Sequence, residues 1–159
     1  SARWLHVGSM TPRSNHSATF VPARLAGPRY AHGCLVLFGG NVRGHRSNTI
    51  DVLDLETMSW ELEKVAGGAA PSPRNSHTAA LQVTADGCRL LVVGGGTGDS
   101  SNGGPPRGGR DLQDAHLLDL RTFRWAPARG TEACAEAVGR GHVLCEVAGT
   151  LVAVGGGGR

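Results

Sequence analysis

The sequence NTIDVLDLETMSW, residues 48–60, returns in altered form as QDAHLLDLRTFRW at residues 113–125. In this alignment Trp60 matches Trp125, and both copies contain the core Leu-Asp-Leu. Each copy follows an apolar run that ends in a pair of glycines. Self-similarity at a fixed spacing predicts a protein built from stacked copies of one structural unit.

Two further markers recur with this stretch. The apolar runs CLVLFGG, CRLLVVGG and TLVAVGG place their first paired glycines at positions 39, 94 and 155, which are 55 and 61 residues apart. An arginine and a histidine precede each run. The markers recur in the same order each time, which coincidence does not explain. The pairs are Arg13 and His16, Arg74 and His77, and a shortened Arg140 and His142.

This order of markers resembles the kelch repeat, a unit of roughly 50 residues. The resemblance covers nearly the whole chain. It implies an all-β fold in which each repeat forms one blade of a β-propeller, a four-stranded antiparallel sheet, with function in the loops at one end. Two departures are present: Leu53 and Leu118 replace the tyrosine common in the third strand, and the third repeat stops after its second strand.

The apolar runs themselves predict strands rather than helices. Residues 35–38 and 90–93 are short, continuous and bounded by glycine, as in strands that are buried on both faces. The second glycine of each pair is expected to allow a positive φ or a close backbone approach. We therefore expect Gly40→Val and Gly95→Val to destabilise the protein.

We predict a single kelch-repeat region over residues 1–159, an incomplete propeller in four parts. Residues 1–8 are expected to form an orphan outer strand, residues 9–66 and 67–128 one blade each, and residues 129–159 half a blade. The expected strands lie at 3–7, at 15–21, 34–39, 49–55 and 59–65, at 76–83, 88–94, 114–120 and 124–127, and at 141–147 and 150–155.

Two complete blades do not make a closed propeller, since such rings have 4 to 8 blades and exposed sheet edges are normally protected. We therefore expect further blades to complete this one. They would come from the same longer chain, the interpretation we favour, or from other subunits.

Composition sets broad limits on cellular context. The net charge is +3, and no transmembrane run or secretory signal is present, so the cytoplasm or nucleus is the default location. Cys34 and Cys88 are predicted at matching positions, and no Cys-x-x-Cys pair occurs. Small buried or free thiols are therefore favoured over disulfides or zinc ligands.

Motifs for catalysis are lacking. His16 and His77 recur at one repeat position, which indicates structural hydrogen bonding rather than a single active site. The run GGGTG at residues 94–98 lacks the Lys-Ser/Thr and the helix that a phosphate loop needs. We predict no catalytic residue, cofactor or metal ligand. The alternative left open is a metal-dependent enzyme on a kelch-like propeller scaffold, as in kelch-like oxidases and specifier proteins.

Most arginines are expected at one end of the propeller. They lie in the loops that lead into the first strand of a blade or follow its second strand. A guanidinium group suits carboxylates, so this loop face is expected to bind a protein or an acidic peptide. The alternatives are solubilising charge and, for Arg13 and Arg74, contacts that hold neighbouring blades together. The arginines assigned to these loops are Arg13, Arg24, Arg29, Arg43, Arg46, Arg74, Arg107, Arg110, Arg129 and Arg140; the predicted partner-binding set is Arg13, Arg43, Arg46, Arg74, Arg107, Arg110 and Arg140.

The function predicted from these features is a protein-interaction module without catalysis. The resemblance implies an adaptor, a scaffold or the substrate receptor of a ubiquitin ligase. Nucleic acid is disfavoured because the arginines are not interleaved with aromatic residues. The Gly-, Ser- and Pro-rich loop at residues 98–110 is either filler or a recognition loop that orders on binding.

Overall fold

A computed structural model describes residues 7, 10–63, 67–84, 87–98, 109–129, 139–147 and 150–156. The orphan strand predicted at residues 3–7 lies outside this part of the chain except for its last residue. Most of the loop predicted at 98–110 also lies outside it.

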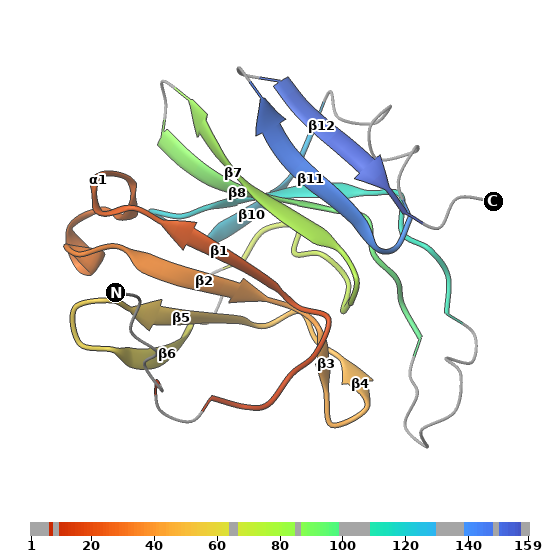
Figure 1. The fold of residues 1–159 in the computed structure, drawn as a ribbon, viewed down its shortest axis with the longest axis horizontal. Helices are drawn as coiled ribbons and strands as arrows, with labels where there is room; N and C mark the ends of the chain where they lie inside the picture. The colour runs from red at the N-terminus through yellow and green to blue at the C-terminus, as the bar shows by residue number, and fades with distance from the viewer. Residues whose placement is uncertain are drawn as a thin grey trace, which may run out of the picture.

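Two four-stranded antiparallel sheets and a strand pair form the structure (Figure 1). All ten of their strands lie where the repeat places them. The first sheet contains β1 (Ser17–Val21), β2 (Cys34–Phe38), β5 (Ile50–Asp54) and β6 (Ser59–Glu63) in this order. The second contains β7 (Thr78–Thr84), β8 (Gly87–Val93), β9 (Ala115–Asp119) and β10 (Arg124–Pro127). The strand pair is β11 (His142–Val147) with β12 (Thr150–Gly155).

The three sheets follow one another like blades. Their first strands, β1, β7 and β11, lie side by side, and the remaining strands extend outward from them (Figure 1). The described sheets do not close into a ring. The architecture is therefore that of an incomplete propeller, as the sequence predicted.

Short elements in the loops were not predicted. A hairpin of β3 (Asn41–Val42) and β4 (His45–Arg46) follows β2, and the two-residue turn between its strands has positive φ at Arg43 and Gly44. Between β1 and β2 lie the helix α1 (Ala23–Ala26) and the 3-10 helix η1 (Pro28–Tyr30). The buried side chains of Ala26 and Tyr30 join the core between the first two sheets.

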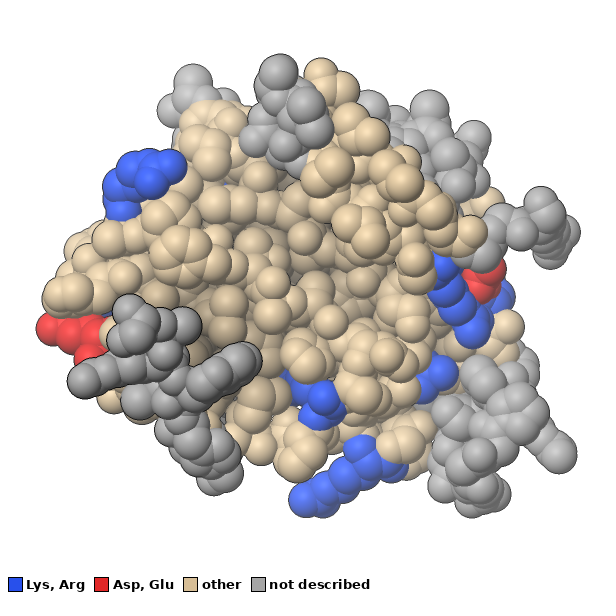
Figure 2. Space-filling model, in the orientation of Figure 1, with Lys and Arg blue, Asp and Glu red and all other residues tan. Residues whose placement is uncertain are grey.

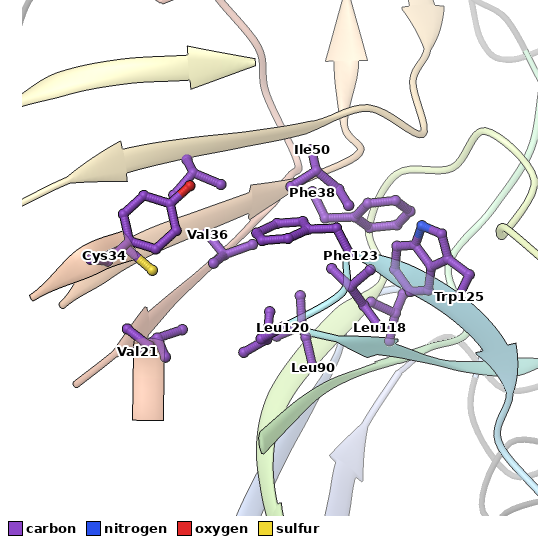
Figure 3. Packing of buried hydrophobic residues seen from close by; sticks show 14 residues of the cluster. Val21, Cys34, Val36, Phe38, Ile50, Leu90, Leu118, Leu120, Phe123 and Trp125 are labelled. Carbon is purple, nitrogen blue, oxygen red and sulfur yellow. The ribbon is translucent and has the colours of Figure 1, made fainter. Parts of the chain in front are cut away.

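The main hydrophobic core lies between the first and second sheets (Figure 3). Alternate residues of each strand face it, because successive side chains of a strand point to opposite faces. The Phe38 ring lies 5.1 Å from Trp125 and 5.1 Å from His77. The first sheet contributes Val36, Phe38, Ile50 and Val52, and the second contributes Leu90, Val92, Leu118 and Trp125.

Cys34 and Cys88 do not occupy matching repeat positions, which corrects the sequence prediction. Cys34 precedes the paired glycines by five residues (39 − 34) and Cys88 by six (94 − 88). A one-residue offset reverses the face on which a side chain lies. Both cysteines therefore border the same core from opposite sheets, and both are free thiols. Burial raises the pKa of the Cys34 thiol to about 11.

The outer edge of the second sheet is covered by the segment that connects the first two sheets. Gly67 accepts a hydrogen bond from the Trp125 amide at 3.4 Å, and Ala69 donates one to the Trp125 carbonyl at 3.2 Å. This pairing protects the edge of β10 from other chains. None of the helices in the described ranges is long and apolar enough to cross a membrane.

Candidate functional site

One end of the molecule, which we call the arginine end, collects the starts of β1, β5, β7 and β9 and the ends of β2 and β8. Basic side chains gather at the lower and right edges of the view in Figure 2, the side on which the β3–β4 hairpin lies in Figure 1. The described arginines at this end are Arg13, Arg43, Arg46, Arg74, Arg110, Arg129 and Arg140.

Arg74 clamps the strands of its own sheet. It is fully buried, and its Nη1 donates to the Gly94 carbonyl at 2.9 Å. The same guanidinium binds both carboxylate oxygens of Asp114, at 2.7 and 2.9 Å. One side chain therefore joins the end of β8 to the residue before β9.

Arg13 makes the equivalent clamp in the first sheet. Only 2 % of its side chain is exposed. It donates to the Gly39 carbonyl at 3.2 Å and forms an ion pair with Asp51. In the repeat alignment Thr49 matches Asp114, so the acidic partner of Arg13, Asp51, stands two residues further along the strand than the partner of Arg74. Residues two apart share a face of a strand, so either position can meet the arginine.

These two arginines are therefore structural. A buried, ion-paired guanidinium cannot reach a docked partner, so Arg13 and Arg74 leave the predicted binding set. The interpretation that they hold the fold together accounts for them better. Their side chains join strands within one blade. The backbone of Arg74 contacts the first blade instead: its carbonyl accepts a hydrogen bond from the Gly40 amide at 2.9 Å, and its amide donates one to the Ser47 carbonyl at 3.0 Å.

Asp114 is the acidic centre of the second clamp. Burial opposes its ionisation, but hydrogen bonds from Arg74 and His116 outweigh burial and hold the pKa of Asp114 well below its ordinary value. His116 Nε2 lies 3.0 Å from Asp114, and its Nδ1 lies 2.9 Å from the Ala69 carbonyl. The clamp thereby also holds the segment that connects the two sheets.

Arg140 does not occupy the place of Arg13 and Arg74. When His142 is matched to His77, the residue that falls on Arg74 is Gly139. Arg140 instead forms an ion pair with Asp111, with Nε 2.6 Å from Oδ1, and lies 3.4 Å from the Thr97 carbonyl. Its charge is thus partly neutralised at the surface.

The exposed arginines of this end lie in different loops, Arg43 in the turn of the β3–β4 hairpin and Arg110 in the segment between β8 and β9. Arg43 and Arg110 are exposed, while Arg46 is half-buried and hydrogen-bonded to Asn41. A cavity of about 330 Å³ opens beside Arg46 and His45. Hydroxyl groups of Thr11, Ser47 and Thr49 also line it, together with the Arg13–Asp51 ion pair. Arg107 lies outside the described residues.

Two arginines assigned to this end lie at the opposite one, which is a correction. Arg24 is in α1 and Arg29 is in η1, and both follow β1 rather than precede it. Arg29 forms an ion pair with Glu61 at 2.7 Å. The error arose from grouping residues around a strand without separating its two ends.

The recurring histidines link neighbouring sheets. His77 Nε2 lies 2.9 Å from Ser17 Oγ, and His142 Nε2 lies 2.6 Å from Thr78 Oγ1. The first bond joins His77, the residue before β7, to β1, and the second joins β11 to β7. Burial, with the Arg74 charge, lowers the pKa of His77 to about 3. In the ranges that the structure describes, no three His, Cys, Asp or Glu side chains come together as metal ligands would.

Sequence reasoning missed the acidic partners of the arginines. Asp51, Asp111 and Asp114 neutralise three of the seven described arginines at this end. One signal could have indicated two of them, because Asp51 and Asp114 stand at the start of the repeated third strand, beside the arginine-histidine segment of the same blade.

Comparisons with known proteins agree with this architecture. The family model described as the KLHDC2/KLHL20/DRC7 Kelch-repeats domain matches residues 5–157. Similar proteins include acyl-CoA-binding domain-containing protein 4 of Arabidopsis thaliana, 34 % identical over 77 % of this chain and 16 % of that protein. The Rab9 effector protein with kelch motifs of Bos taurus is 30 % identical over 82 % of this chain and 34 % of that protein. The chain thus spans about a third or less of the length of these relatives.

Proposed function

This chain belongs to the kelch-repeat family, and from that premise we propose that it is part of a protein-interaction propeller that binds acidic partners at its arginine end. The observation that supports this most directly is that some arginines of this end are buried and ion-paired whereas others are exposed. Buried clamps use Arg13 and Arg74, whereas Arg43 and Arg110 remain exposed at the same end of the molecule. Exposed guanidinium groups favour carboxylates.

The type of partner we propose is a protein. The Rab9 effector, a relative of this chain, is named for a protein partner and for its kelch motifs. We further propose that the partner is a substrate presented to a ubiquitin ligase, in keeping with the kelch resemblance. Co-purification of a ubiquitin ligase subunit with the full-length protein tests this finer role.

The binding test uses a fluorescein-labelled octaglutamate peptide and the double variant Arg43→Asn/Arg110→Gln. Asn before Gly44 suits the type I′ turn of the β3–β4 hairpin, so the variant loses charge without losing the turn. We expect the variant to bind at least about fivefold more weakly, and binding by the wild type to weaken as salt is raised.

The matched control is Arg24→Gln/Arg121→Gln, which removes two exposed arginines from the opposite end. This control should bind the peptide as tightly as the wild type. Equal losses in both double variants would mean that net charge alone attracts the peptide, and the proposal would fail. Thermal unfolding of each variant verifies that the fold is retained.

A further inference from the structure

Thr49, the residue before β5, places an exposed hydroxyl group at the cavity of about 330 Å³ at the arginine end. Its Oγ1 lies 3.5 Å from Arg13 Nη1 and 2.9 Å from Ser47 Oγ. The Arg13 side chain is only 2 % exposed and forms the inner wall of this cavity. A reactive hydroxyl group that faces solvent therefore lies beside a buried positive charge.

The second blade has a carboxylate at the repeat position of Thr49. Asp114 matches Thr49, and both of its carboxylate oxygens bind Arg74, at 2.7 and 2.9 Å. In the first blade this position presents a neutral hydroxyl group to Arg13, the counterpart of Arg74. A negative group attached to Thr49 Oγ1 would give the first blade the charge that this position has in the second.

The cavity offers positive charge and hydrogen-bond donors to such a group. Arg13 and Arg46 both line it, and so do the hydroxyl groups of Thr11 and Ser47. One carboxylate, that of Asp51, also lines it and opposes a further negative charge, but it already forms an ion pair with Arg13. A phosphate group has a charge of about −1.5 to −2 and three strong acceptor oxygens, so two guanidinium groups suit it.

The sequence before Thr49 is typical of a protein kinase substrate. Arg46 and Arg43 stand three and six residues before it, and many kinases bind arginine at such positions through carboxylates of their own cleft. Among the 159 residues, Thr49 is the only serine or threonine that follows an arginine or lysine by three positions. The β3–β4 hairpin that contains both arginines projects from the sheets (Figure 1), and its strands have two residues each. Short exposed segments of this kind open locally at low cost, which gives a kinase access.

We propose that Thr49 is the acceptor of a protein kinase that recognises arginine before its target, and that the resulting phosphate pairs with Arg13 and Arg46 in the cavity. Thr49 Oγ1 attacks the γ-phosphorus of ATP, and its hydroxyl proton passes to the catalytic base of the kinase. The bond from that phosphorus to the β–γ bridging oxygen breaks, and ADP leaves. The phosphate adds negative charge at the arginine end and should repel acidic partners, a consequence that rests on the proposed function.

Kinase treatment of the folded 159-residue chain tests the acceptor. The probe is the catalytic subunit of the cyclic-AMP-dependent protein kinase with ATP. We expect a phosphate on Thr49, located by tandem mass spectrometry, and none on the variant Thr49→Val. Arg46→Gln should slow the reaction at least about tenfold, whereas Arg24→Gln, which changes an exposed arginine of the opposite end, should not. A folded chain that stays unmodified, or that is modified elsewhere, would overturn the inference.

The variants Thr49→Asp and Thr49→Asn test the pairing without a kinase. The first places the acidic side chain of the second blade at this position, and the second is its neutral analogue of the same shape. Thr49→Asp should unfold at a higher urea concentration than Thr49→Asn, and this difference should shrink when Arg46→Gln is added to both. An equal or lower midpoint for Thr49→Asp would show that repulsion from Asp51 prevails, and the pairing would be wrong.

Binding of the octaglutamate peptide separates this inference from the proposed function. The phosphorylated chain should bind the peptide at least about fivefold more weakly than the unmodified chain, because like charges repel at the same end. Equal binding before and after phosphorylation would contradict the regulatory consequence. Failure of the unmodified chain to bind would instead contradict the proposed function, while phosphate on Thr49 and the higher midpoint of Thr49→Asp would still support the inference.

Discussion

Ion pairing at single residues separates structural arginines from accessible ones. Arg74 has no exposed surface and five hydrogen bonds to Ser72, Gly94 and Asp114, whereas Arg43 projects from a hairpin turn. Removal of one partner of a buried ion pair leaves the other uncompensated. Folding therefore explains why arginine stands at positions 13 and 74, and any binding role belongs to the exposed arginines.

His77 should make stability depend on pH. The ordinary pKa of histidine is 6.5, and burial lowers the pKa of His77 to about 3; burial also lowers the pKa of His16 and of His142. The unfolded chain therefore binds protons that the folded chain does not. The stability contributed by neutral His77 is fully present above pH 6.5. As the pH decreases from 6.5 toward 3, the free energy of unfolding falls by up to about 1.4 kcal/mol per pH unit for one such site.

Urea unfolding between about pH 7 and pH 4.5 measures this dependence. His77→Gln should flatten it, because this variant lacks the buried imidazole whose pKa is lowered in the folded chain. Equal slopes for the wild type and His77→Gln would contradict the assignment.

The sequence predicted which histidines and arginines recur, but not their partners. His77 meets Ser17, which is 60 residues away, and Arg74 meets Asp114, which is 40 residues away. Such contacts depend on the register and packing of sheets. The acidic residue stands at position 51 in the first blade and at the place of position 49 in the second, so the sequence indicates an acidic residue near the start of each third strand but does not show that it pairs with the arginine.

At the scale of elements, the end of each second strand depends on glycine. Gly95 has φ +95°, and a Cβ there would lie 2.7 Å from the Asn75 carbonyl oxygen. Gly95→Val should therefore lower the free energy of unfolding by on the order of 3 kcal/mol, from backbone strain and overpacking. Chemical denaturation measures the change.

Gly141→Asn is the matched control. Gly141 also has positive φ, at +71°, but nothing lies within 4 Å of the place that a Cβ would occupy there. Asn15 and Ser76 adopt positive φ at the equivalent positions of the other repeats. Asparagine tolerates this conformation, so the change should cost less than about 1 kcal/mol. A similar loss in both variants would show that close approach is not what requires glycine at Gly95.

Long apolar strands were predictable as elements, and short insertions were not. The helix α1 has four residues and the hairpin strands β3 and β4 have two each. Segments of this length contain too few residues to show a hydrophobic period. Their stability comes from tertiary contacts such as the buried side chain of Tyr30, which the local sequence does not specify.

For the whole molecule, the order of the repeats fixes which sheet faces which, but not what covers the last face. Phe20 on the first sheet is 55 % exposed, and Val143 and Val154 on the strand pair are 63 % and 60 % exposed. Val143 pairs with Val154 across β11 and β12. Apolar side chains side by side on an exposed sheet indicate a surface that normally contacts protein.

We therefore expect the isolated chain to self-associate through the exposed face of β11–β12. Val143→Thr/Val154→Thr should reduce concentration-dependent association in sedimentation velocity, because it removes apolar area while keeping residues that favour strands. Its unfolding free energy should change by less than about 1 kcal/mol, since both side chains are mostly exposed. Val83→Thr, at a residue 57 % exposed on β7, is the matched control and should leave association unchanged. Association that persists in the double variant would place the self-association surface elsewhere, with the face around Phe20 as the next candidate.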